Sequence, residues 1–220
     1  AYEIRNCDWS SDVCSSDLTY DLVLRGGTLL DGSRAAGVRG DVAIREGRIA
    51  ALGTFPVPPG TPVLPVGDLH VAPGFIYVHV HVDTDVVRQP LCENFLRMGV
   101  TTLITGNCGS SVPDLGAHFA RLEQGGLGAN YGSLIGHGTV RRAVLGTQNR
   151  APTGDELRRM ADLVDAGMQQ GAFGMSTGLI YVPGIYSDTA ELVELSKVVA
   201  KHGGIYRSEE HTSELQSQFR

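Results

Sequence analysis

The sequence predicts an α/β protein in which a small all-β unit precedes the first half of a (β/α)8 barrel. Residues 20–70 hold short apolar runs broken by glycine and proline, without a helical period. From Gly74, strand-like and helix-like runs alternate four times, which is typical of parallel βαβ units. These strands are apolar and end in polar residues, and residues 74–206 supply about half of the roughly 200 to 250 residues in a full barrel.

The all-β unit is expected to consist of short antiparallel strands. The predicted strands are 20–25, 28–30, 40–45 and 48–52. Gly26-Gly27 predicts a turn between the first two, and Glu46-Gly47 predicts a hairpin between the last two. The proline-rich stretch 55–65 cannot be a central strand. We therefore expect a partial, β-sandwich-like domain over residues 19–71.

The barrel half is expected over residues 72–206. Its predicted strands are 75–81, 100–105, 130–135 and 172–177, and a fifth begins at 205–206. Its predicted helices are 91–98, 114–124, 155–170 and 189–202. Thr153 and Glu156 form a capping box that favours a helix start there. An open doubly wound sheet is the alternative, but no Gly-x-Gly-x-x-Gly turn follows the first strand to support it.

Both ends of the chain are excluded from the prediction of fold and site. Residues 8–18 and 207–217 lack apolar periodicity, and they match translated sequencing-library adapter in opposite orientations. Residues 1–7 match the neighbouring primer and index. We therefore expect segments 1–18 and 207–220 to be adapter-derived and not structural, so that Cys7, Cys14 and His211 are not ligand candidates.

Charge, apolar run length and cysteine content limit the classes of partner and the cellular location that we expect. The net charge is −6, and it is −2 without the adapter-like ends, which carry three basic and seven acidic residues. With no basic stripe to neutralise phosphates, we expect no nucleic-acid partner. No apolar run approaches the roughly 20 residues of a membrane span, so we expect no membrane partner. The two remaining cysteines are too few for a disulfide framework, which favours a cytoplasmic location.

The main candidate site begins at the first barrel strand. His79 and His81 end this apolar run, and residues two apart on a strand point to the same face. Two imidazoles on one face at a strand end suit a transition metal. The alternative is two neighbouring histidines at a strand edge with no ligand.

Other candidates follow the later strands, whose carboxyl ends meet at one mouth in a barrel. Cys108 follows the second strand as a third candidate ligand, although a buried free cysteine is the alternative. His137 follows the third strand and either binds substrate or caps a loop. The fourth offers Ser176, Thr177 and Tyr181. By contrast, we expect structural roles for His70, His118 and Cys92.

Several motifs together resemble one enzyme family. The segment Pro73-Gly74-Phe75-Ile76-x-x-His79-x-His81 is similar to the metal-dependent amidohydrolases. The N-acyl-D-amino-acid deacylases (D-aminoacylases) are more similar still. The motifs that carry this resemblance are Gly99-Val100-Thr101-Thr102, Gly106-Asn107-Cys108-Gly109, Gly136-His137-Gly138-Thr139-Val140-Arg141 and 173–184.

The resemblance implies a zinc enzyme with one tight zinc and a second, weaker metal position. Cys108 matches the cysteine that binds the tight zinc and contacts the second metal, and His79 and His81 match the pair at the weaker position. In that family, two more histidines follow the fifth and sixth strands, and a catalytic Asp follows the eighth. These have no match here, so the acid/base residue stays unknown and the chain is expected to be an N-terminal fragment.

Two details bear on this resemblance. Many other amidohydrolases bridge their metals with a carboxylated lysine on the fourth strand, whereas both lysines here, Lys197 and Lys201, lie in the following helix. A cysteine-bridged site is therefore the consistent choice.

The family usually has Asp where Tyr77 stands, two residues before His79. Since alternation places Tyr77 on the face of the histidines, we expect a bulky phenol beside the site, either genuine or a sequencing error.

The implied activity is metal-assisted hydrolysis of an N-acyl-D-amino acid to a carboxylate and a free D-amino acid. The expected partner is this small molecule, with His137, Ser176 and Tyr181 as candidate substrate-binding residues. Two alternatives remain. The scaffold could serve another linear or cyclic amide, as imidases and dihydroorotases do, or the chain could be truncated and inactive. An open half-barrel exposes strand edges and apolar faces, so we expect the 220-residue chain to aggregate.

Overall fold

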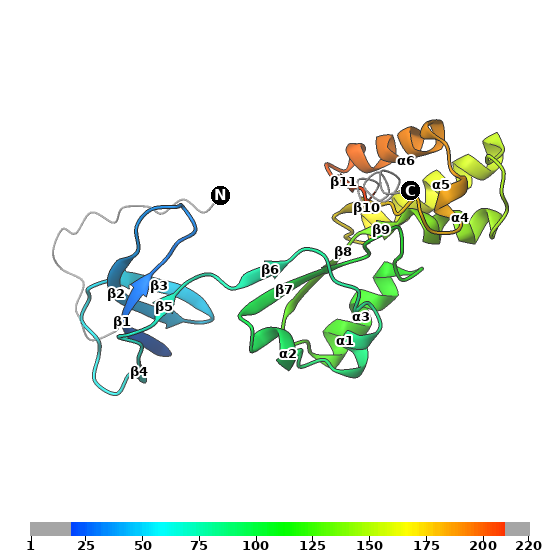
Figure 1. Cartoon of the computed structure of the whole chain (residues 1–220). Coiled ribbons are helices and arrows are strands. Elements are labelled where there is room, and N and C mark those ends of the chain that lie inside the picture. Colours follow the sequence, from blue (N-terminus) through cyan, green and yellow to red (C-terminus); the bar gives the residue numbers. More distant parts are fainter. Residues whose placement is uncertain (1–18, 210–220) are drawn as a thin grey trace. The chain divides into compact units, whose positions relative to one another are not determined.

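A computed structural model describes residues 19–209 (Figure 1). Of the expected adapter segments 1–18 and 207–220, all residues except 207–209 lie outside this range. The described chain divides between Pro73 and Gly74 into two compact units. Over residues 19–209, no helix is long and apolar enough to cross a membrane.

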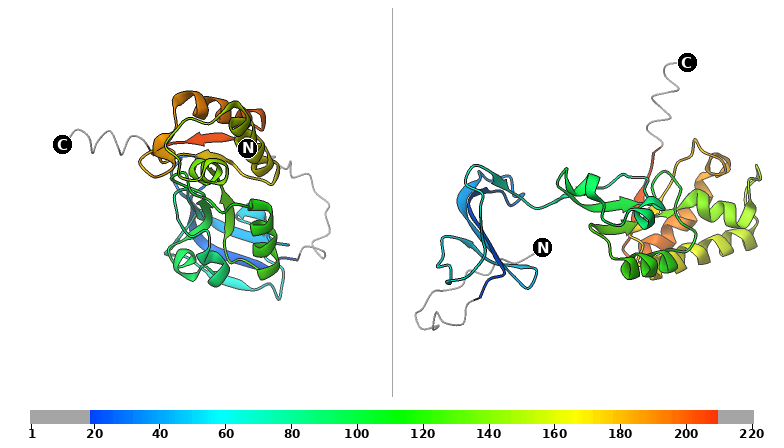
Figure 2. Two further views of the ribbon diagram at one scale, coloured as in Figure 1. Left: turned by 90° about the vertical axis from the view of Figure 1, so that its right-hand side faces the viewer. Right: turned by 90° about the horizontal axis from the view of Figure 1, so that it is seen from below.

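The first unit is a single mixed sheet, blue to cyan in Figure 2. Its strands are β1 (Leu22–Leu29), β2 (Val38–Arg45), β3 (Arg48–Gly53), β4 (Val63–Pro65) and β5 (His70–Val71). The order is β3-β2-β1-β4, and β5 also pairs with β1. Because β4 and β5 pair parallel with β1, the expectation of antiparallel strands alone is wrong. Residues 19–73 contain this one sheet, and no second sheet faces it to make a sandwich.

The predicted Gly26-Gly27 turn is also wrong, because β1 passes through both glycines. The pairing with β2 shifts register between Leu24 and Gly27, so the glycines form a bulge and not a chain reversal. Gly26 has a φ of 78° and donates its N–H to Asp41 Oδ1 at 2.7 Å. The Glu46-Gly47 hairpin between β2 and β3 is confirmed.

Residues 74–209 of the second unit contain two three-stranded parallel sheets. The first has the order β6-β7-β8, with β6 (Phe75–Tyr77), β7 (Val100–Thr105) and β8 (Asn130–Ser133). The second has the order β11-β10-β9, with β9 (Ile135–Gly136), β10 (Gly174–Ser176) and β11 (Ile205–Arg207). The predicted strand 130–135 is thus split at Leu134. The parallel α/β arrangement is confirmed, but within the described residues the strands do not close into a barrel.

Six α-helices lie among these strands. They are α1 (Asp85–Arg88), α2 (Glu93–Leu96), α3 (Leu115–Gly125), α4 (His137–Leu145), α5 (Gly154–Gln169) and α6 (Thr189–Lys201), with a 3₁₀ turn, η1, at Gly184–Tyr186. The capping box at Thr153 and Glu156 is confirmed at the start of α5. Helix α4 was not predicted, because its residues 137–145 follow β9 directly.

Two apolar cores support the unit. One lies between β9–β10 and helices α4–α6, with Met160, Met175 and Leu195 fully buried. The other lies around Leu103 of β7 and Phe95 of α2. Figure 1 shows α4, α5 and α6 gathered around β9–β11, and α1–α3 beside β6–β8. The candidate ligands His79, His81 and Cys108 follow strands β6 and β7.

Candidate metal centre

The two candidate histidines lie just beyond a strand. Strand β6 ends at Tyr77, so His79 and His81 lie in the irregular segment that follows, where the backbone bends at His79. The backbone N–H of Val80, between them, donates to the Ile104 carbonyl of β7 at 3.4 Å. This bond keeps the segment in register with β7 although regular pairing has ended. Both imidazoles therefore leave the chain near the carboxyl end of β7.

Cys108 lies in the tight loop that follows β7. Three residues of this loop have left-handed backbone, with φ values of 72° at Gly106, 53° at Cys108 and 73° at Gly109. Glycine adopts this conformation freely, whereas a cysteine does so at a cost. A Cβ on Gly106 would stand 2.0 Å from the Leu134 carbonyl oxygen, so the loop also needs a glycine for space. The loop turns the Cys108 side chain back toward the histidines.

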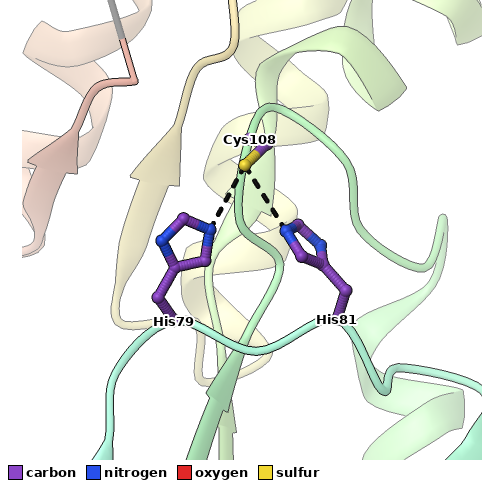
Figure 3. Close-up of side chains that lie close together, drawn as sticks. All are labelled: His79, His81 and Cys108. Atoms are coloured by element: carbon purple, nitrogen blue, oxygen red, sulfur yellow. Dashed lines mark hydrogen bonds between the residues drawn. The ribbon is translucent and has the colours of Figure 1, made fainter. Parts of the chain in front are cut away.

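The three side chains converge on one point (Figure 3). Cys108 Sγ lies 3.3 Å from His79 Nε2 and 3.4 Å from His81 Nε2. The ligand atoms of all three residues lie within 4.8 Å of one another. With Zn–S near 2.3 Å and Zn–N near 2.0–2.1 Å, a tetrahedral ion would separate sulfur from nitrogen by about 3.5 Å. The donor set and its spacing therefore suit a zinc ion.

Burial favours the neutral forms of Cys108 and His79. It is the main cause that raises the pKa of the Cys108 thiol and lowers the pKa of the His79 imidazole. A neutral imidazole is ready to bind a metal, whereas the thiol must lose its proton to do so. Glu209 lies 3.3 Å from His79 Nδ1. Because Glu209 belongs to the segment 207–220 that we expect to be adapter-derived, we assign it no role.

Tyr77 is not where alternation predicts it. Its ring packs edge-on against Phe95 of α2, with ring centroids 6.1 Å apart. Regular strand pairing stops at Tyr77, so the shared face expected for Tyr77, His79 and His81 does not extend across the three residues.

A cavity of about 350 Å³ opens beside the candidate ligands His81 and Cys108. Its remaining walls come from the loop after Cys108, the start of α4 and the segment after β10. These lining residues are Gly109, Ser110, Gly138, Thr139, Arg142, Gly178, Tyr181, Val182, Pro183 and Gly184. Tyr181 is 57% exposed and is the predicted substrate-binding residue that lines this cavity.

The other two candidate substrate residues, Ser176 and His137, are fully buried and do not face the cavity. Ser176 is fully buried, accepts the Gly109 N–H at 3.0 Å and donates to the Gly106 carbonyl. His137 is also fully buried, and its Nε2 lies 2.7 Å from Glu191 Oε1. Neither lines the cavity. Thr177 is buried as well, with its hydroxyl 2.8 Å from that of Tyr206.

His137 belongs to a buried charged cluster with Glu191 and Arg141. Glu191 of α6 bonds both His137 and the Arg141 guanidinium of α4, and all three side chains are at most 1% exposed. Arg141 also donates to the carbonyls of Arg150, at 2.6 Å, and Tyr186, at 3.1 Å. The cluster thus ties α4 and α6 to η1, which borders the cavity.

Sequence reasoning missed Glu191, Arg141, Arg142 and Thr139. Arg141 was part of a motif that carries the resemblance. Because helix α4 was not predicted, the sequence did not indicate which residues of this helix face the cavity and which are buried. Glu191 carried no signal apart from its place in the first turn of a helix, where acidic residues are common.

Comparison with known proteins identifies relatives over most of the chain. No protein-family model matches the chain. It is 36% identical over 215 residues to a D-aminoacylase from Alcaligenes xylosoxydans xylosoxydans, covering 87% of this chain and 44% of the relative. The chain thus spans less than half the length of this relative.

Solved structures give the same family. An N-acyl-D-glutamate deacylase from Bordetella bronchiseptica, complexed with zinc and a phosphonate mimic of the tetrahedral intermediate, matches with a TM-score of 0.83 and 34% identity, over 87% of this chain and 45% of that one. A D-aminoacylase studied for its binuclear metal centre matches with a TM-score of 0.77 and 30% identity, over 91% of this chain and 48% of that one. The chain belongs to the N-acyl-D-amino-acid deacylase (D-aminoacylase) family of amidohydrolases.

Proposed function

We propose that this chain carries part of the active site of a zinc-dependent deacylase that hydrolyses N-acyl-D-amino acids. The observation that carries the proposal is the convergence of His79, His81 and Cys108 from two separate segments onto one point. Two imidazoles and a thiolate are the donors that zinc prefers. The zinc complex and the binuclear metal centre of the two relatives support zinc here, with a second metal position beside it.

The three residues leave room for the metal's further ligands. A tetrahedral ion has four ligand positions, and these side chains fill three of them. When bound, zinc would polarise the substrate's acyl carbonyl and lower the pKa of a water molecule to about 7. The short distances from Cys108 Sγ to both imidazoles, 3.3 and 3.4 Å, also support the proposal that the thiolate shares one metal position with the histidine pair.

The cavity beside the ligands is the proposed substrate site. Its walls offer the Tyr181 ring for apolar contact and the Arg142 guanidinium for a negative charge, whereas the Thr139 hydroxyl already bonds the Ser111 backbone. Arg142 Nη2 already donates to the Val182 carbonyl at 2.8 Å, which fixes the guanidinium at the cavity wall. An N-acyl amino acid brings an apolar acyl group and one carboxylate, and these walls can bind both. No residue of this chain is assigned as the acid/base.

We further propose that the parallel strands form part of a (β/α)8 barrel. The support is their succession in chain order from β6 to β11, with helices between them and the candidate ligands at their carboxyl ends. Strands β6 and β11 lie at the two outer edges and expose apolar side chains, among them Phe75, Ile76 and Ile205. In a barrel, further strands would cover these edges.

The experiment is an assay of free D-amino acid released from N-acetyl-D-amino acids by a protein extended to the length of these relatives. We expect release from the D but not the L enantiomers, loss of activity after chelation, and recovery with zinc. Neutral and acidic side chains should both be tried, since the relatives include a D-aminoacylase and an N-acyl-D-glutamate deacylase. Turnover that survives complete metal removal would contradict the proposal.

A further inference from the structure

We infer that Asn107 and Ser176 are positioning residues that hold Cys108 against the two histidines and thereby set the affinity of the centre for zinc. This inference rests on the proposed metal centre. Neither residue lies in the ligand set, and neither lines the cavity. Both are fully buried and bonded to the backbone on either side of Cys108.

Asn107 links the two segments that carry the ligands. Its side-chain Nδ2 donates to the Ile104 carbonyl at 2.9 Å and to the Val80 carbonyl at 3.3 Å. Val80 is the residue between His79 and His81, so one amide group joins the histidine segment to the cysteine loop. The backbone carbonyl of Asn107 also accepts the Ser110 N–H at 3.0 Å, which closes the loop around Cys108.

Ser176 holds the same loop from the second sheet. Its hydroxyl lies at the end of β10, accepts the Gly109 N–H at 3.0 Å and donates to the Gly106 carbonyl. These two glycines flank Asn107 and Cys108 directly. On the other side, Asp83 Oδ1 accepts the Gly106 N–H at 3.2 Å. The loop is therefore fixed from the histidine segment and from β10 at once.

The backbone of Cys108 explains why this support is needed. A non-glycine residue at a φ of 53° is strained, and such strain persists only where the surroundings over-determine the conformation. Without the Asn107 and Ser176 bonds, the loop could relax to ordinary backbone and move Sγ away from the 3.3 and 3.4 Å contacts with the histidines. Zinc would then have to reorder the loop on binding, which lowers its affinity.

The test compares zinc dissociation constants of the 220-residue chain by equilibrium dialysis, which does not depend on association state. Asn107→Asp keeps the shape of the side chain but replaces the amide donor with a carboxylate that faces two carbonyls. Ser176→Ala removes the hydroxyl without adding charge. We expect roughly 10- to 100-fold weaker zinc binding in each, the range found for groups that orient metal ligands.

Two matched substitutions control for general damage. Asn130→Asp removes amide bonds to Thr101 and Thr102 at the opposite end of β8, and Ser187→Ala removes a 2.7 Å bond to the Gly184 carbonyl. Both should bind zinc as the wild type does, and circular dichroism checks that every variant is folded.

Folded Asn107→Asp and Ser176→Ala variants that bind zinc within about twofold of the wild type would overturn the inference and leave the metal centre standing. If Asn107→Asp does not fold, Ser176→Ala decides the matter. A wild-type chain that binds no zinc would overturn the proposed metal centre itself, and the inference with it.

Discussion

Replacing Glu191 with glutamine should destabilise the second unit by about 3 to 5 kcal/mol. Glu191 is 1% exposed and accepts hydrogen bonds from both Arg141 and His137. Glutamine has the same shape but no charge, so the fully buried Arg141 guanidinium would keep its backbone bonds and lose its counter-charge. Removing one partner of a buried ion pair costs this much because the other charge cannot regain its hydration.

The assay is urea denaturation followed by far-ultraviolet circular dichroism. For a chain of this size, the expected loss corresponds to a melting temperature lower by about 6 to 20 °C. Glu194→Gln on the same helix is the matched control, because its 2.6 Å pair with Lys197 is exposed and should contribute less than about 1 kcal/mol. A Glu191→Gln variant as stable as the Glu194→Gln variant would refute the reasoning.

Three further predictions concern local structure. Thr153→Ala should destabilise the chain by about 1 kcal/mol in urea denaturation, because it removes one half of a capping box. The hydrogen bonds from Arg150 hold the pKa of Glu156 at about 2, below its ordinary 4.5, so its stabilisation is present above pH 4.5 and is lost as the pH falls toward 2. Melting curves of the wild type and Glu156→Gln should therefore converge across that window, and a constant gap would contradict this. Gly106→Ala should weaken zinc binding in equilibrium dialysis more than Gly47→Ala does. Both glycines have positive φ, but only a Cβ at Gly106 would meet backbone, at 2.0 Å from the Leu134 carbonyl oxygen. Equal zinc affinities of the two variants would contradict this prediction.

The local signals in the sequence predicted much of the second unit. Strand 100–105 matches β7, and the capping box at Thr153 marks the start of α5. These elements could be predicted because β-branched runs and caps act within a few neighbouring residues. The first unit was harder. Gly26-Gly27 predicts a turn, but the pairing of β1 with three other strands makes it a bulge. Long-range pairing overrode the local preference there.

The candidate site shows the same division. His79, His81 and Cys108 were predicted as ligand candidates from their residue types at strand ends, and the structure brings their ligand atoms together. Ser176 and His137 were also selected for polarity at strand ends, but polarity does not distinguish a side chain that faces a cavity from one bonded inside its wall.

Cobalt substitution tests the central claim most directly, that His79, His81 and Cys108 together hold one metal ion. The 220-residue chain should bind one Co²⁺ with the intense absorption of a thiolate-to-cobalt charge transfer. Cys108→Ser should abolish this band, His79→Ala and His81→Ala should weaken Co²⁺ binding, and Cys92→Ser should leave the band intact because Cys92 is a buried core residue. A band that survives Cys108→Ser, or its absence from the folded wild-type chain, would contradict the proposed centre.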